Sequence, residues 1–139
     1  MLKFKAPLAA VIAVAVLAIP AATIAKPEHS AKSTEALAKA LAGRTAGPAT
    51  RCVPDFRSSD MKIIDDGTII FGQGKTVYLQ KPVGGCPGLG IGGNSLVARQ
   101  FATNRMCQGD INEVVDVRNG ITIGSCVFED FVPYTRSKL

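Results

Sequence analysis

Four cysteines constrain this chain of 139 residues more than any other feature of its sequence. They are Cys52, Cys86, Cys107 and Cys126, and they lie 34, 21 and 19 positions apart. A structural zinc site needs close pairs such as Cys-x-x-Cys, because one turn must present two thiolates to one ion. An even number of widely spaced cysteines instead predicts two disulfides formed in an oxidising compartment.

Three pairings of these cysteines are open. We favour Cys86–Cys107 together with Cys52–Cys126, since the first bridge would close a local excursion and the second would tie the first strand region to the last. Each bridge would stabilise the fold by roughly 2–4 kcal/mol. That contribution matters in a domain with a small core.

The first 25 residues have the three-part layout of a secretory signal peptide. Two lysines precede an apolar run that ends at Pro20, and small residues lead to an expected cleavage after Ala25. A retained membrane anchor is the alternative, because the apolar stretch 6–25 is about 20 residues and just long enough to span a bilayer. The prolines and the small-residue end favour cleavage. We therefore expect a periplasmic or secreted protein with no stable membrane insertion after cleavage.

Residues 26–51 are rich in Ala, Lys and Thr and contain no aromatic residue. Ser33 is a candidate cap for a helix over residues 34–42, and Gly43 follows its end. A helix of about nine residues is too short to be stable alone in water. We expect a flexible tether with one short helix, which could alternatively dock on a partner, and a C-terminal tail over residues 134–139.

The folded domain is expected over residues 52–133. Short β-branched and aromatic runs alternate there with Gly and Asp turns, and Asn119-Gly120 is a strong hairpin signal. We predict a mainly β fold, a small disulfide-stabilised barrel or sandwich of about six short strands. The expected strands are 61–64, 68–71, 76–79, 114–117, 121–123 and 127–132, and residues 95–103 fit a helix or a strand. The aromatic residues expected mostly in its core are Phe56, Phe71, Tyr78, Phe101, Phe128 and Phe131.

The motifs of common enzymes find little support. His29 is the only histidine and lies in the expected tether, so the domain holds no Ser-His-Asp or Cys-His pair. Residues 88–93 fit G-x-G-x-x-G, but this glycine-rich stretch matches by chance and the chain is too short for a parallel α/β sheet. Gly74-Lys75-Thr76 lacks the earlier glycine of a P-loop, because Ile69 occupies that position. We therefore expect no cofactor.

Clustered carboxylates are the remaining candidates for chemistry. Asp65 and Asp66 form one pair, and Asp110, Glu113 and Asp116 form a second group that could serve acid–base catalysis or bind Ca²⁺. Turn residues and solvated strand faces explain them more simply, so we assign no catalytic or metal-binding residue. Convergence of these side chains in one pocket would favour the enzyme or Ca²⁺ interpretation.

The net charge of +5 divides unevenly along the chain. Residues 1–25 carry +2, residues 26–51 carry +3, residues 52–133 carry −2 and residues 134–139 carry +2. The basic balance is thus outside the expected domain and gives no argument for an anionic partner. Aromatic and basic residues are not interleaved, so we do not expect nucleic-acid binding.

Six segments on and around the cysteines form a pattern: Cys52, Asp65-Asp66-Gly67-Thr68-Ile69-Ile70-Phe71, Cys86-Pro87-Gly88-Leu89, Met106-Cys107-Gln108-Gly109-Asp110, Gly124-Ser125-Cys126 and residues 128–133. This pattern resembles a family of small exported four-cysteine proteobacterial proteins known only as a domain of unknown function. The likeness covers residues 52–133, and it departs from the family at residues 90–93 and at Val127. It implies export, disulfides and a small compact fold, and it transfers no catalytic residues.

The sequence therefore predicts an exported protein whose ligand and partners are unknown. A non-enzymatic binding or envelope-associated domain is the favoured function, with an envelope protein as the candidate partner. The alternative is a small carboxylate-dependent, hydrolase-like enzyme or a Ca²⁺-binding domain, and a toxin-type or inhibitor-like secreted protein is a third possibility.

Overall fold

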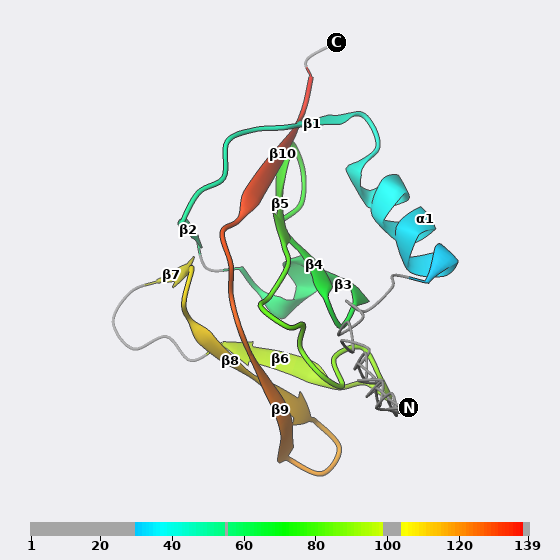
Figure 1. The fold of residues 1–139 in the computed structure, drawn as a ribbon, viewed down its shortest axis with the longest axis vertical. Coiled ribbons are helices and arrows are strands. Elements are labelled where there is room, and N and C mark those ends of the chain that lie inside the picture. The colour runs from blue at the N-terminus through cyan, green and yellow to red at the C-terminus, as the bar shows by residue number, and fades with distance from the viewer. Residues whose placement is uncertain (1–29, 55, 99–103, 138–139) are drawn as a thin grey trace, which may run out of the picture.

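The computed structural model describes residues 30–54, 56–98 and 104–137. The expected signal peptide, His29 and Phe101 lie outside these residues. The fold is mainly β, as predicted, and it consists of three open antiparallel sheets and one helix rather than a closed barrel (Figure 1). The elements are α1 (Ala31–Leu41), β1 (Arg44–Ala46), β2 (Cys52–Pro54), a 3₁₀ turn (Ser58–Asp60), β3 (Met61–Asp65), β4 (Thr68–Phe71), β5 (Thr76–Gln80), β6 (Ser95–Ala98), β7 (Arg105–Cys107), β8 (Ile111–Asp116), β9 (Ile121–Val127) and β10 (Val132–Arg136). No helix within the described ranges is long and apolar enough to cross a membrane.

The largest sheet has the strand order β1-β10-β5-β4-β3, and its centre is the predicted meander β3-β4-β5. Each connection is short because Gly and Asp residues make tight turns. Asp65 Oδ1, for example, accepts a hydrogen bond from Gly67 N at 3.0 Å. The other sheets are β6-β8-β9 and the pair β2-β7.

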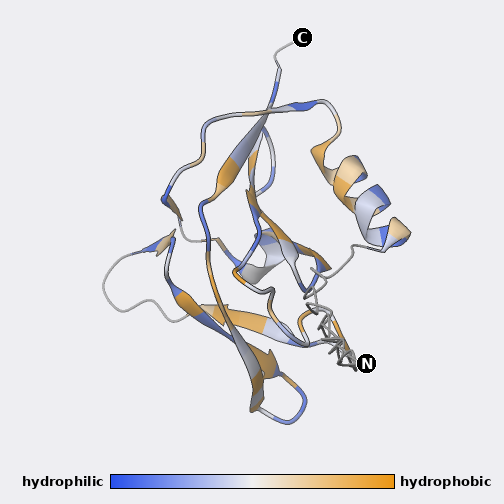
Figure 2. Cartoon of the chain, in the orientation of Figure 1, coloured by the Kyte–Doolittle hydropathy of each residue, from blue (hydrophilic) through white to orange (hydrophobic). Residues whose placement is uncertain are grey.

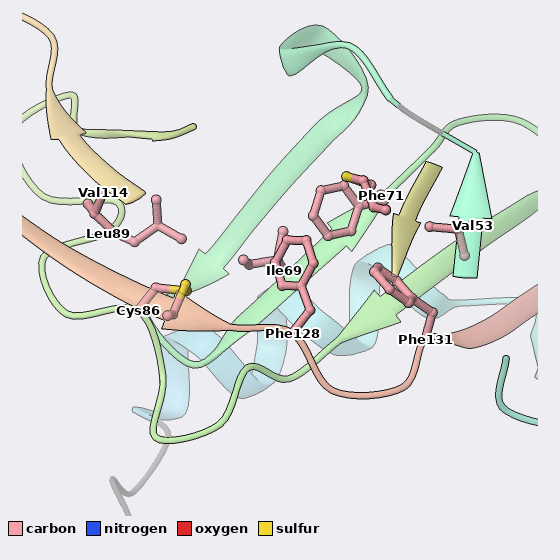
Figure 3. Close-up of a cluster of buried hydrophobic side chains, with 10 residues drawn as sticks. Val53, Ile69, Phe71, Cys86, Leu89, Val114, Phe128 and Phe131 are labelled. Carbon is pink, nitrogen blue, oxygen red and sulfur yellow. A yellow bond between two sulfur atoms is a disulfide. The ribbon is translucent and has the colours of Figure 1, made fainter. Parts of the chain in front are cut away.

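The main core lies where the three sheets meet (Figure 3). Phe128 is its centre: it meets Phe71 and Phe131 edge-on, with ring centroids 5.7 and 5.5 Å away. All three rings are buried, and such edge-to-face pairs add to the free energy of burial. The buried members of this cluster are Val53, Ile69, Phe71, Cys86, Leu89, Met106, Val114, Cys126, Phe128 and Phe131.

A second core lies on the opposite face of the large sheet, under α1. Every residue of β4 is buried, since successive side chains point to opposite faces and both faces are covered. Leu37 and Leu41 of α1 pack against a buried cluster that includes Ile70 of β4, and Tyr134 of β10 joins them. Figure 2 shows both apolar and polar residues in α1, and the apolar residues Leu37 and Leu41 are among those that pack against the sheet.

The described parts of the expected tether and tail, residues 30–51 and 134–137, belong to the folded domain. Residues 31–41 form the helix, capped by Ser30 rather than Ser33: the Ser30 side chain accepts from Ser33 N at 3.2 Å. Residues 44–46 form β1, which pairs with β10, and β10 continues to Arg136, beyond the expected end of the domain. The expectation of a flexible tether and a separate tail was wrong, because contacts with the sheet supply the stability that a short helix and a three-residue strand lack alone.

The favoured disulfide pairing is also wrong. The bridges are Cys52–Cys107 and Cys86–Cys126, and no cysteine is free. Cys52 and Cys107 are direct partners in the β2–β7 register, with Cα atoms 4.0 Å apart. The disulfide connectivity follows from the pairing of strands that are distant in sequence, and loop length does not predict it.

One predicted strand, 127–132, is interrupted. Strand β9 ends at Val127 and β10 begins at Val132. Between them the fully buried side chain of Gln80 donates to Glu129 O at 2.8 Å and accepts from Glu129 N at 3.0 Å. The Gln80 amide thus supplies the two hydrogen bonds that a neighbouring strand would otherwise make with the backbone of Glu129, between β9 and β10.

Candidate functional site

Three of the five carboxylates singled out in the sequence, Asp65, Asp110 and Asp116, accept hydrogen bonds from nearby backbone N–H groups. Asp110 Oδ2 accepts from Cys107 N at 2.7 Å. Asp116 accepts from Arg118 N at 2.9 Å and from Asn119 Nδ2 at 2.6 Å, and these bonds, Asn119 first, lower the pKa of its carboxyl. Within the described ranges, no group of three or more His, Cys, Asp or Glu side chains is arranged to hold a metal ion. The structure thus places these carboxylates at separate turns and strand positions.

The glycine-rich stretch 88–93 is a loop against the sheets. A Cβ on Gly88 would lie 2.9 Å from Ile123 Cδ1, and a Cβ on Gly90 would lie 3.2 Å from Ile63 Cγ2. Both glycines also have positive φ, which disfavours other residues. Close packing and backbone conformation therefore account for these glycines.

A cleft between α1 and the large sheet brings basic side chains together. We call it the helix-side cleft; it has a volume of about 460 Å³. Its charged lining residues are Lys39, Arg44, Asp60, Lys62 and Arg136. Four cations and one carboxylate thus surround an open space of small-molecule size.

The strand register explains why these cations share one face. Tyr134 packs in the helix-side core, and Arg136 lies two positions further along β10, on the same face. Arg44 of β1 is the direct partner of Arg136, so both side chains belong to the helix side of the sheet. Lys62 of β3 is the direct partner of Ile70, another residue of that core. Lys39 comes from the last turn of α1.

The Arg44 guanidinium is held by the turn between β4 and β5. Nη1 donates to Lys75 O and Nη2 donates to Gly74 O, each at 2.7 Å, and Nη1 has a longer contact of 3.5 Å to Tyr134 O. Arginine has five N–H donors, and these contacts leave Nε–H and one Nη2 proton. Nε is buried and has no hydrogen-bond partner. Burial, and secondly the charge of Arg136, lower the pKa of Arg44 below its usual value.

The cations of the cleft are poorly balanced by acidic groups. Lys39 Nζ lies 3.5 Å from Glu35 Oε1 in an exposed pair of low stabilising value. Asp60 Oδ1 accepts from Gln73 Nε2 at 3.0 Å. In the described part of the chain, neither Arg44 nor Arg136 lies within salt-bridge distance of a carboxylate. The cleft therefore has unneutralised positive charge.

Arg44 and Arg136 lie in the segments expected to be a tether and a tail, so this cleft was not predicted. The net charges of the segments are as counted. The expectation that they give no argument for an anionic partner assumed that the two basic flanks lie apart, whereas the β1–β10 pairing brings Arg44 and Arg136 together. The only available signal was that both flanks of the β-rich region are basic. Comparisons of the chain with models of protein families, with curated proteins and with solved structures find no match.

Proposed function

We propose that the protein is an exported, non-enzymatic binding domain of the cell envelope, and that it binds an anionic ligand in the helix-side cleft. The cleft carries this proposal, because four cations face one carboxylate around a volume of about 460 Å³. Pockets of this size hold small molecules or parts of larger ones. Clustered charge of one sign also raises the rate at which an oppositely charged ligand arrives.

Two other features support export and binding. Two disulfides are typical of proteins in an oxidising compartment, in agreement with the signal-peptide pattern of residues 1–25. Asp110 and Asp116 accept hydrogen bonds from their own turns, which gives the alternative of a carboxylate-dependent hydrolase or Ca²⁺ domain less support.

A thermal-shift screen of the mature protein tests the binding proposal. The panel contains phosphate, pyrophosphate, sulfate, citrate and a uronic acid, and the reference is a neutral sugar. We expect at least one anion to raise Tm, because a ligand that binds only the native state stabilises it. The double variant Lys39→Glu/Lys62→Glu should abolish that rise.

The matched control is Lys32→Glu/Lys81→Glu, which reverses the charge at two exposed lysines that do not line the cleft. It should keep the rise in Tm. A panel without any effect, or equal loss in both double variants, contradicts a binding role for the cleft. Fractionation of cells that express the full chain tests export separately, and cytoplasmic protein with residues 1–25 retained would contradict it.

A further inference from the structure

We infer that the ligand of the helix-side cleft carries a phosphoryl group, and that Arg44 and Arg136 bind it. This inference rests on the proposed function, since it names the chemical class of the ligand for the same cleft. Its starting point is the direct pairing of Arg44 with Arg136 across β1 and β10.

Two like charges directly opposite each other on one face of an antiparallel pair destabilise it. Here they belong to the outermost strand pair of the sheet, and Arg44 is partly desolvated as well. Each guanidinium would gain from an anion between them. The free apo protein therefore has an electrostatic cost that a bound anion would remove.

Donor geometry adds a second argument. The turn carbonyls of Gly74 and Lys75 fix the Arg44 guanidinium, so little side-chain entropy remains to be lost on binding. The buried Nε–H of Arg44 lacks an acceptor. That nitrogen is closed to solvent and therefore to a ligand, but the second Nη2 proton of Arg44 also has no acceptor among the described groups, and an oxyanion supplies strong acceptor oxygens.

The arrangement of the cations favours a phosphoryl group over a carboxylate. They come from four elements, α1, β1, β3 and β10, and so approach the cleft from several directions. A phosphate monoester has three terminal oxygens directed tetrahedrally and a charge of about −1.5 to −2 at pH 7. A single carboxylate has two oxygens in one plane and a charge of about −1. To the paired guanidiniums of Arg44 and Arg136, a phosphoryl group therefore offers more acceptor oxygens and more negative charge than a carboxylate does.

The helix end gives the competing explanation. The last turn of α1 carries partial negative charge, and Lys39 there interacts favourably with it. If the cations served only the helix end, removing one of them would lower stability without changing the affinity for any anion. The experiment below measures both quantities.

Isothermal titration of the mature, oxidised protein with pyrophosphate and glycerol 3-phosphate provides the test, with citrate as a carboxylate of high charge. Binding of the phosphoryl compounds should be tighter than that of citrate. Arg136→Gln should weaken it by about ten-fold to a hundred-fold, because a hydrogen bond to a charged group is lost. Arg136 is exposed and donates no side-chain hydrogen bond in the described structure, so this variant should fold normally. Arg118→Gln, on the exposed β8–β9 turn, is the matched control and should bind as the wild type does.

Sedimentation with phosphatidylcholine vesicles, with and without phosphatidic acid, identifies the source of the phosphoryl group. Binding to the soluble compounds indicates a free phosphate compound, and binding only to phosphatidic acid vesicles indicates a lipid headgroup. Either result supports the inference if Arg136→Gln weakens the binding. Citrate binding as tight as that of pyrophosphate would overturn the inference and leave the proposed function intact. No binding of any anion or vesicle would overturn both. An unchanged affinity in Arg136→Gln would contradict a ligand-binding role for Arg136 and overturn the inference.

Discussion

Removal of the Cys86–Cys126 bridge should cost the domain a large part of its stability. Cys86 is 0% exposed and Cys126 is 3% exposed. Because alanine is apolar, the double variant Cys86→Ala/Cys126→Ala places no polar group at these buried positions. The bridge closes a loop with a sequence separation of 40. Chain entropy assigns about 4 kcal/mol to a loop of that length. Lost packing of the two sulfur atoms adds roughly 1 kcal/mol.

The matched control is Cys52→Ala/Cys107→Ala. Its loop separation is 55, and since closure entropy changes only with the logarithm of loop length, the entropic contribution is again about 4 kcal/mol. Cys52 and Cys107 are half-buried in the two-stranded sheet, so this variant should lose less packing. The difference between the two variants thus isolates the core contribution of the Cys86–Cys126 sulfurs.

Urea unfolding followed by far-UV circular dichroism measures both variants against the wild type. Each variant should show a lower midpoint and a larger m-value, because its unfolded chain exposes more surface. Since small domains are stable by about 5–15 kcal/mol in total, the midpoint should fall by a third or more. A loss below about 1 kcal/mol for Cys86→Ala/Cys126→Ala would refute the entropic argument. A Cys86–Cys107 peptide in a digest of unreduced wild type would refute the connectivity itself.

Three further outcomes follow from the structure. Phe128→Ala should destabilise the protein by about 3–5 kcal/mol in the same urea assay, because its ring is 1% exposed at the centre of the main core; a loss under about 1 kcal/mol would contradict that position. Leu41→Ala should cost about 1–2 kcal/mol, since Leu41 is half-buried, and should speed amide hydrogen exchange in α1; unchanged exchange would mean that the helix does not depend on this contact. The carboxyl of Asp116 should titrate below 3.8 by NMR, and Asn119→Ala should raise its pKa towards that value. Because the pKa of Asp116 is lower in the folded state, the stability that its carboxylate contributes is present above pH 3.8 and is lost as the pH falls through the folded pKa. A titration midpoint of Asp116 at or above 3.8 would show that these hydrogen bonds do not lower its pKa.

The elements that the sequence predicted well are those with strong local signals. Strands β3, β4 and β5 are β-branched runs between Gly and Asp turns, and each lies within one residue of its expected end. The β8–β9 hairpin follows from Asn119-Gly120, although β8 begins earlier and β9 ends later than expected. Of residues 95–103, which fitted two structures, Ser95–Ala98 form β6.

The elements that the sequence did not reveal depend on distant partners. Strands β1, β2 and β7 have three residues each, too few to show a periodic pattern. The cysteine pairing depends on the β2–β7 register, which joins residues 55 positions apart. The spacing of Leu37 and Leu41 on one helix face could be read from the sequence, but the face of the sheet that they cover could not.

The cleft was hidden for the same reason. Arg44 and Arg136 come from opposite ends of the described chain, and only the pairing of β1 with β10 makes them neighbours. Charge counted by segment cannot detect such a site, because the count contains no information on which segments meet.

The most direct test of this account is an NMR titration of uniformly ¹⁵N-labelled mature protein with pyrophosphate. We predict saturable shifts in the amide signals of Gly74 and Lys75, whose carbonyls hold Arg44, and in those of Arg44 and Arg136, with little change at the distant β8–β9 turn. Shifts scattered over exposed lysines without saturation, or their absence at Arg44 and Arg136, would contradict a phosphoryl site in the helix-side cleft.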